Sequence, residues 1–302
     1  MQSLQQLNQQ FAIDDQLQFE YNAAGMIVAT ITNTFATLSL SMYGAQVLSY
    51  RPVTESEDVL FLSDKAAYGE GRAIRGGVPI CWPWFSDDAA DLGVAPHGFA
   101  RNQQWQVVAT KTNQEGSTEI RLALSQTKDS LSVWPYEFNL ILDVIVGESL
   151  DMTLVTENVG QKTFTITQAL HTYFKVSDVQ DIEITGLDDK QYLDKVIDFS
   201  EQTQHGVTTI SGEVDRVYLA PPSTVTLTDA GFKREIIITS TGNKTLVVWN
   251  PGVEIIQRLS DLSAEAYKDF VCIETANAMI DKVTLAAGQR HSLSANYQVN
   301  KQ

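Results

Sequence analysis

An alternation of apolar and polar side chains, with a period of two residues, runs through most of this chain and limits the folds that it can adopt. Clear examples are MIVATITNTFATLSLSMY (26–43), FNLILDVIVGESLDMTLVTENV (138–159) and REIIITST (234–241). Successive side chains of a strand point to opposite faces of a sheet, so this period gives each strand one apolar face. The segments are rich in Val, Ile, Thr and Phe and are separated by Gly, Asn, Asp and Ser, as strands joined by turns are.

Helical signals are scarce beside these strands. Leu4, Leu7 and Phe11 have helical spacing and predict a short helix or arm within residues 1–15. LSDLSAEAYKD (259–269) is the best internal candidate for a short helix. Roughly fifteen or more strands, with no repeat and no linker between them, favour an all-β fold. We therefore expect residues 1–302 to form a single domain, a large antiparallel β-sandwich with a few short helices.

The charge balance excludes several kinds of partner. The chain has 21 Lys and Arg against 37 Asp and Glu, a formal net charge of −16, so it is poorly suited to nucleic acid or to an anionic membrane surface. The opening MQSLQQLNQQF lacks the basic start and apolar core of a secretory signal, and no apolar stretch is long enough to cross a bilayer. We expect a soluble, cytoplasmic monomer with reduced thiols at Cys81 and Cys272.

The segments GRAIRGGVPICWPWFS (71–86) and APHGFARNQQW (95–105) fit neither a plain strand nor a plain helix. Their arginines offer forked donors suited to anionic oxygens, and their glycines let the backbone approach a ligand closely. Trp82, Trp84 and Phe85 offer flat apolar walls. The segments predict the floor of a pocket for a small polar molecule, and their arginines would suit an anionic one. They fit equally well a Pro- and Gly-rich turn over buried aromatic side chains.

His171 lies in FTITQALHTYFKV (164–176), where the alternation separates two faces. One face carries Thr165, Thr167, Ala169, His171 and Tyr173, and the other carries Phe164, Ile166, Leu170 and Phe174. Because the second face is apolar, we expect it to pack in the core. His171 is then expected on the opposite face of the strand, among polar or small side chains. An exposed surface histidine is the alternative.

Glu274 lies in FVCIETAN (270–277) and shares a strand face with Phe270 and Cys272. A carboxylate on such a face is unusual, because an unpaired buried charge is costly. Burial would raise its pKa and suit it to proton transfer. The alternative is a glutamate at a sheet edge, paired with an arginine.

Other chemistries have little support in the sequence. There is no G-x-S-x-G elbow, no Walker loop and no dinucleotide-binding glycine fingerprint. Two cysteines cannot make a structural zinc site, and no two histidines have metal-ligand spacing. A metal site made of His97, His171 and Glu274 would require long-range convergence. We expect no metal and no cofactor.

Five motifs in order, RGGVPICWPWF, HGFARNQQW, LHTYFKV, DRVYL and FVCIETAN, give the chain a family likeness from about Gly44 to Gly288. It resembles the aldose 1-epimerase (galactose mutarotase) superfamily, and within it the glucose-6-phosphate 1-epimerases, or hexose-6-phosphate mutarotases. The resemblance implies a large antiparallel β-sandwich with its sugar site on a concave sheet face. It also implies a cofactor-independent enzyme that interconverts the α and β anomers of a hexose 6-phosphate, with glucose 6-phosphate as the first choice.

The resemblance implies roles for particular residues. His171 in LHTYF matches the general acid of the family, and Glu274 in CIETAN matches its general base. A proton-transfer pair is what opening and closing a hemiacetal ring requires. Two alternatives stay open: a mutarotase for unphosphorylated aldoses, and a non-catalytic carbohydrate-binding sandwich that has kept the pocket without the chemistry.

The remaining motif residues are implied to bind substrate. His97 in HGFAR matches a second active-site histidine that contacts the sugar, and Asp215 in DRVYL matches an aspartate that binds sugar hydroxyls. Arg75 and Arg101 match the arginines that the phosphosugar branch uses for the phosphate. Several relatives carry glutamine immediately before the HG pair, whereas this chain has Pro96, which leaves the preferred hexose open.

Overall fold

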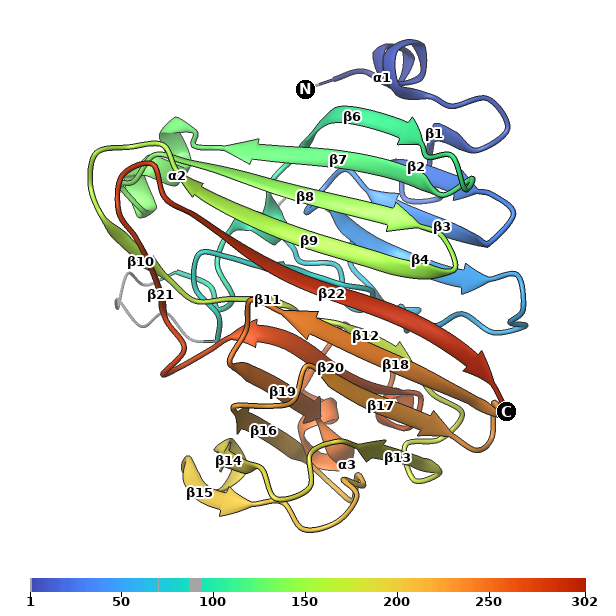
Figure 1. The fold of residues 1–302 in the computed structure, drawn as a ribbon, viewed down its shortest axis with the longest axis vertical. Helices are drawn as coiled ribbons and strands as arrows, with labels where there is room; N and C mark the ends of the chain where they lie inside the picture. The colour runs from blue at the N-terminus through green and yellow to red at the C-terminus, as the bar shows by residue number, and fades with distance from the viewer. Residues whose placement is uncertain (1, 70, 87–93) are drawn as a thin grey trace.

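The computed structural model describes residues 2–69, 71–86 and 94–302, and most of its regular structure is antiparallel strand. One of two eight-stranded sheets crosses the front of the molecule in Figure 1. In sheet order its strands are β13 (Ile182–Thr185), β17 (Thr224–Asp229), β18 (Arg234–Thr241), β22 (Arg290–Lys301), β9 (Ser149–Asn158), β8 (Phe138–Val146), β7 (Thr118–Ser125) and β6 (Gln106–Thr112).

A second eight-stranded sheet lies behind the lower part of this front sheet in Figure 1. Its path is β15 (Ser200–Thr203), β14 (Gln191–Asp194), β16 (Val214–Leu219), β19 (Thr245–Asn250), β20 (Phe270–Asn277), β11 (Gln168–Leu170) and β5 (Ile80–Cys81), with β12 (Tyr173–Lys175) also paired to β20. Behind the upper part lies a sheet of β1 (Leu17–Tyr21), β2 (Ile27–Thr32), β3 (Ala36–Ser41) and β4 (Gln46–Pro52). A small ladder joins β10 (Phe164–Ile166) to β21 (Val283–Leu285).

Alternation explains why these sheets stack. Along β8 and β9 every second residue is buried, as in Leu140, Leu142 and Val144, and the residues between them are only partly buried. The buried rows meet in one apolar cluster that extends from Leu7 near the N-terminus to Tyr297 near the C-terminus. The prediction of a large antiparallel β-sandwich is confirmed.

The short helices agree with the sequence only in part. The predicted N-terminal helix is present as α1 (Leu4–Phe11), where Ser3 and Gln6 form a capping box. The internal candidate at 259–269 was wrong: it is turns with a single 3₁₀ segment, η4 (Ala266–Lys268). Its apolar side chains pack on the second sheet beside Phe270, so tertiary contacts replace helical hydrogen bonds.

Several short helical segments were not predicted. They are η1 (Ala100–Asn102), α2 (Lys128–Val133), η2 (Lys195–Ile197), α3 (Gly252–Ile255) and η3 (Ile256–Arg258). The capping box of α2, formed by Thr127 and Ser130, was a readable signal. None of the helices in the described residues is long and apolar enough to cross a membrane.

Arg234 on β18 joins the front sheet to the strands behind it. Its side chain is fully buried and donates hydrogen bonds to the backbone oxygens of Asp58 (3.0 Å) and Lys175 (2.8 Å). Glu55 lies 3.7 Å from the guanidinium, and the ring of Phe232 lies under it at 5.0 Å. The buried charge is therefore surrounded by oxygen acceptors and one aromatic face.

We expect Arg234→Met to lower the free energy of unfolding by about 3–5 kcal/mol, because it leaves two carbonyls and a carboxylate buried without their cation. Urea unfolding measures the change. Arg121→Met is the matched control, since Arg121 forms a bidentate but exposed pair with Asp143 and should cost about 1 kcal/mol or less. Equal losses for the two variants would contradict a structural role for Arg234.

Candidate active site

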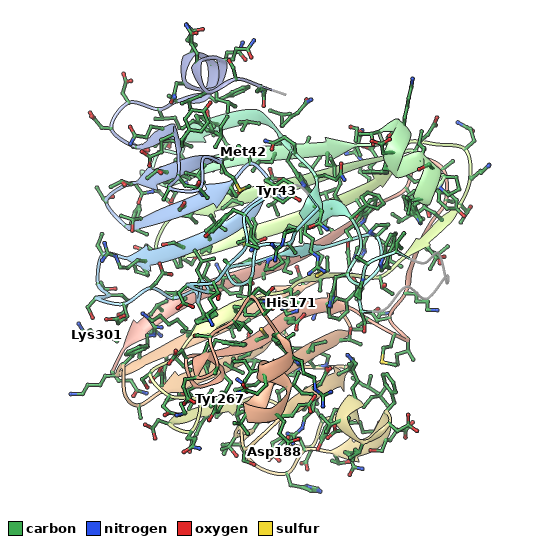
Figure 2. The ribbon with its side chains drawn as sticks, turned by 180° about the vertical axis from the view of Figure 1, so that it is seen from behind. Met42, Tyr43, His171, Asp188, Tyr267 and Lys301 are labelled. Atoms are coloured by element: carbon green, nitrogen blue, oxygen red, sulfur yellow. The ribbon has the colours of Figure 1, made fainter. Side chains whose placement is uncertain are left out.

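The site is built around a cross-strand pair, His171 and Glu274, on the second sheet. β11 pairs with β20 through Leu170 and Thr275, and β12 pairs with β20 through Tyr173 and Cys272. Both ladders keep the same register, so His171, in the gap between β11 and β12, stands opposite Glu274. The imidazole Nδ1 and the carboxyl Oε1 are 3.4 Å apart. Figure 2 shows His171 near the middle of the molecule when it is viewed from behind.

Both members of the pair are buried. His171 is 7% exposed and Glu274 is 1% exposed, so the alternative of an exposed surface histidine was wrong. β20 has β19 on one side and β11 and β12 on the other, so Glu274 is not at a sheet edge, and its nearest ionisable partner is a histidine and not an arginine. The second alternative was therefore wrong as well.

Burial sets the protonation of the pair. It lowers the pKa of His171 well below its ordinary value, and the nearby His97, Arg101 and Arg75 lower it further. Burial also raises the pKa of Glu274 well above its ordinary value; Asp215 adds to this effect and Lys195 opposes it. The charged form of each group is disfavoured for lack of solvation. Burial therefore favours the neutral form of the imidazole and the protonated form of the carboxyl.

Aromatic rings hold the imidazole in place. Tyr173 stacks on His171 with ring centroids 4.9 Å apart and planes 7° apart, and Trp249 meets it edge-on at 6.1 Å. Phe85 approaches from another side at 6.3 Å. This packing fixes the ring orientation and keeps the surroundings apolar, which is the physical cause of the low basicity.

His97 lies beside the pair, as the motif suggested. Its ring centroid is 5.5 Å from that of His171, and its Nδ1 accepts a hydrogen bond from the backbone N–H of Ser86 (3.3 Å). Both His97 (φ 68°) and Gly98 (φ 71°) have left-handed backbones. A Cβ on Gly98 would lie 2.0 Å from the backbone oxygen of Trp82, so only glycine fits there. Burial lowers the pKa of His97 to about 3, and Arg101 contributes.

Arg75 and Arg101 differ in how they are held. Arg75 donates from Nε to Asp261 (3.0 Å) and from Nη1 to the hydroxyl of Tyr173 (3.0 Å), so it is already oriented by two partners. Arg101 donates from Nη2 to the backbone oxygen of Pro96 (2.8 Å), and its Nε is buried without a hydrogen-bond acceptor. Among the described residues Arg101 makes no ion pair with a carboxylate, in contrast to Arg75.

Asp215 on β16 is paired with a cation that the sequence did not single out. Lys195 Nζ in η2 lies 2.8 Å from Asp215 Oδ2. The two act on Glu274 with opposite signs, and Lys195 also contributes to lowering the pKa of His97. Lys195 is therefore a third cation near the pair.

Sequence reasoning missed several neighbours of the site. Tyr173 and Cys272 could have been found, because the alternation placed them on the same faces as His171 and Glu274. Lys195 and Asp261 lie in irregular segments, where no periodic pattern indicates the direction of a side chain.

The expectation of an aromatic wall was wrong for Trp82. Trp82 is fully buried among Phe99, Trp134 and Phe138 in the core of the sandwich, which is the alternative that the sequence left open. Trp84 is also buried and meets Phe99 edge-on. Phe85 alone faces the two histidines.

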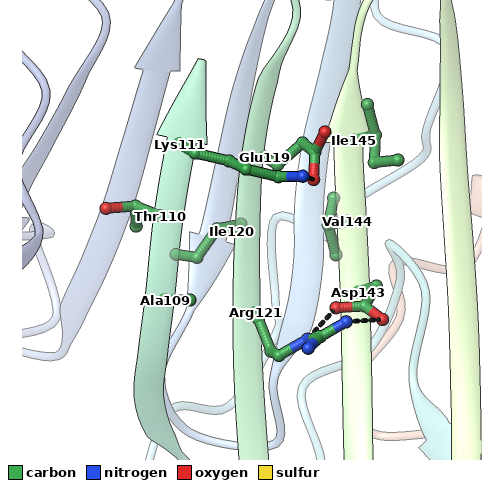
Figure 3. A pocket seen from close by; sticks show the side chains of 9 residues that line it. All are labelled: Ala109, Thr110, Lys111, Glu119, Ile120, Arg121, Asp143, Val144 and Ile145. Carbon is green, nitrogen blue, oxygen red and sulfur yellow. Dashed lines mark hydrogen bonds and ion pairs between the residues drawn. The ribbon is translucent and has the colours of Figure 1, made fainter. Parts of the chain in front are cut away.

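A separate hollow lies on the front sheet, across β6, β7 and β8 (Figure 3). Its charged side chains are already matched, Arg121 with Asp143 and Lys111 with Glu119. None of the motif residues lines it. The hollow therefore lacks the chemistry that surrounds His171 and Glu274.

Comparison with known proteins gives consistent matches. A protein of Escherichia coli strain K12, named "Putative glucose-6-phosphate 1-epimerase", is 38% identical over 241 residues, or 80% of this chain and 79% of that protein. A protein of the same name from Cenchrus ciliaris is 34% identical over 257 residues, or 82% of this chain and 77% of that protein. A solved structure from Salmonella typhimurium, described as a "putative mutarotase", is 31% identical, has a TM-score of 0.88, and the match covers 97% of this chain and 96% of that one.

The match to a whole family is equally broad. The model of the family described as aldose 1-epimerase matches residues 28–298. This range contains all five motifs and every residue of the site described above. The chain belongs to the aldose 1-epimerase family.

Proposed function

We propose that this protein interconverts the α and β anomers of a hexose 6-phosphate, with glucose 6-phosphate as the first candidate. The observation that carries the proposal is the buried pair of His171 and Glu274, 3.4 Å apart. Burying two titratable groups is costly, and a module that only binds sugar has no need of both. The pair therefore favours an enzyme over a non-catalytic carbohydrate-binding sandwich.

The chemistry of the reaction matches one acid and one base. A base removes the proton from the C1 hydroxyl while an acid protonates the ring oxygen. The bond between C1 and the ring oxygen breaks, and the C1 hydroxyl oxygen becomes the oxygen of a free aldehyde. The C1–C2 bond then rotates, and the ring closes on the other face of the carbonyl with the proton transfers reversed. Each positioned acid or base contributes about 10²–10⁴-fold to such a reaction.

One shared proton is enough for this cycle. One proton is taken from the sugar and one is returned, so the pair ends each half-reaction with the number that it began with. The assignment of His171 as acid and Glu274 as base requires the proton to sit on the imidazole in the reactive form. Burial favours the carboxyl instead before substrate binds. The two forms differ only in which of the two groups, 3.4 Å apart, carries the proton. Closure of the ring also reverses the roles of acid and base.

The phosphate would be held by local cations. With a net charge of −16 the chain does not attract a dianion at long range, so recognition depends on short contacts. Arg75, Arg101 and Lys195 all act electrostatically on His97 beside the pair. Arg75 and Lys195 are paired with Asp261 and Asp215, whereas Arg101 has no carboxylate partner among the described residues, so Arg101 is the first candidate for the phosphate. The name of the Escherichia coli relative supports a phosphorylated sugar as the substrate. Asp215 and His97 are the candidates for the sugar hydroxyls.

Magnetisation exchange between the two anomers, followed by NMR, tests the proposal. We expect the purified protein to accelerate exchange of glucose 6-phosphate at least about 10-fold more, in kcat/KM, than exchange of glucose or galactose, since each charge-assisted contact contributes about 1.5–3 kcal/mol. Equal acceleration of all three sugars would favour a mutarotase for unphosphorylated aldoses. Saturable binding of glucose 6-phosphate without any acceleration would favour the carbohydrate-binding sandwich.

A further inference from the structure

Three metal-ligating side chains lie together at the His171–Glu274 pair, and the reaction uses only two of them. His171, Cys272 and Glu274 each offer one ligand atom, and these atoms lie within 4.8 Å of one another. Cys272 is on the same strand and the same face as Glu274, two residues earlier, and is opposite Tyr173. The proton transfers derived above give the thiol no role.

The ligand atoms have unused lone pairs. Nδ1 of His171 and Oε2 of Glu274 are buried and have no hydrogen-bond partner. A buried polar atom without a partner destabilises the folded protein. Burial also keeps Cys272 as a thiol, because it raises the thiol pKa well above the ordinary value. The group thus brings three ligand atoms within 4.8 Å of one another, and two of its side chains have a buried atom without a hydrogen-bond partner.

The charge and the spacing of this group suit a divalent, thiophilic ion. A neutral imidazole, a thiolate and a carboxylate together carry two negative charges, which a divalent ion cancels, so no net charge is left in the buried site. Zinc bonds of about 2.0–2.3 Å place tetrahedral ligand atoms roughly 3.3–3.8 Å apart. The imidazole and carboxyl, at 3.4 Å, already match this spacing. Thiolate and imidazole ligands select zinc and similar ions over magnesium or calcium.

We propose that His171, Cys272 and Glu274 form an inhibitory binding site for zinc or a similar thiophilic divalent ion. Binding releases the thiol proton and the carboxyl proton to solvent and forms one metal–sulfur, one metal–nitrogen and one metal–oxygen bond. No electron is transferred. The ion then occupies the lone pairs that anomerisation needs, so the metal-loaded protein is inactive. This inhibition rests on the proposed function, whereas the binding itself does not.

Cobalt(II) titration of the metal-free protein tests the site without any reference to activity. A thiolate-to-cobalt charge-transfer band should appear with one equivalent and disappear when zinc displaces the cobalt. Cys272→Ser should abolish the band and weaken zinc binding more than about 100-fold, because even outer-shell changes cost 10–100-fold. Cys81→Ser is the matched control: Cys81 is the other buried cysteine, lies outside the three-residue group, and should leave the band unchanged.

A second readout compares the anomerisation rate of each variant with and without zinc, each relative to its own metal-free rate. Zinc should inhibit the wild-type protein and Cys81→Ser, a chelator should restore both, and Cys272→Ser should be resistant. Absence of the cobalt band from folded wild-type protein would overturn the site. Zinc binding without inhibition would overturn its inhibitory role. If Cys272→Ser does not fold, Glu274→Gln serves for the binding measurement. An inactive metal-free protein that still shows the band would refute the proposed function and leave the site supported.

Discussion

Glu274→Gln and His171→Asn should each lower the rate of hexose 6-phosphate anomerisation by about 10²–10⁴-fold, the range that a positioned acid or base contributes. Each substitution nearly preserves side-chain volume and removes only the proton-transfer function. Because the two groups exchange a single proton, the double variant should be little worse than the poorer single variant. Anomer exchange measured by NMR, at substrate concentrations below KM, gives the ratio of kcat/KM.

Unfolding measurements distinguish a loss of catalysis in Glu274→Gln from a folding defect. The folded-state pKa of Glu274 is raised above its ordinary value of 4.5, so above that pH the unfolded chain gives up a proton that the folded chain retains. The wild-type free energy of unfolding therefore falls as pH rises from the ordinary glutamate range toward the raised pKa. Glutamine does not titrate, so this fall in the free energy of unfolding is absent from Glu274→Gln. Thermal unfolding should thus show a larger stabilisation by Glu274→Gln at about pH 8 than at about pH 5. Near wild-type turnover in a stable variant would remove Glu274 from the mechanism.

Arg101→Ala should reduce kcat/KM for glucose 6-phosphate by roughly 10- to 150-fold, because a charge-assisted hydrogen bond contributes about 1.5–3 kcal/mol. Its effect on glucose should be small, since glucose presents no phosphate. Arg101 gives the cleaner test of the two arginines: it has no carboxylate partner among the described residues, whereas Arg75 is joined to Asp261 and Tyr173. Both sugars are assayed in parallel with the exchange method.

Two controls sharpen the arginine test. Arg72→Ala removes an exposed arginine from the same segment as Arg75 and should change neither substrate appreciably. Arg75→Ala should resemble Arg101→Ala on glucose 6-phosphate and should also lower stability, because it leaves Asp261 without its cation. Equal losses on both sugars for Arg101→Ala would mean that Arg101 holds the loop or the sugar ring, and the proposal would revert to a general aldose mutarotase.

Strand periodicity made the fold predictable, and the same periodicity located two residues of the site, His171 and Glu274. His171 and Glu274 could be assigned to strand faces from their neighbours alone. Their burial could not, because alternation tells which residues share a face but not whether that face is covered. Here Tyr173, Trp249 and Phe85 cover it, and they come from separate segments of the chain.

The irregular segments were the least predictable part. Lys195 begins a short 3₁₀ segment after β14, and Asp261 lies in a segment whose composition suggested a helix. The positions of such residues depend on tertiary contacts that leave no periodic trace. Trp82 illustrates the opposite error: a Gly- and Pro-rich context suggested a ligand wall, whereas the ring fills the sandwich core.

The shared register of β11 and β12 restricts how this chain can evolve. Leu170 and Tyr173 are both tied to β20, and between them His171 faces Glu274 while Thr172 faces the core, where its hydroxyl bonds with Tyr297. A single inserted or deleted residue here would exchange the two faces or break one of the ladders. The length of the chain across this gap is therefore fixed for as long as the reaction is kept.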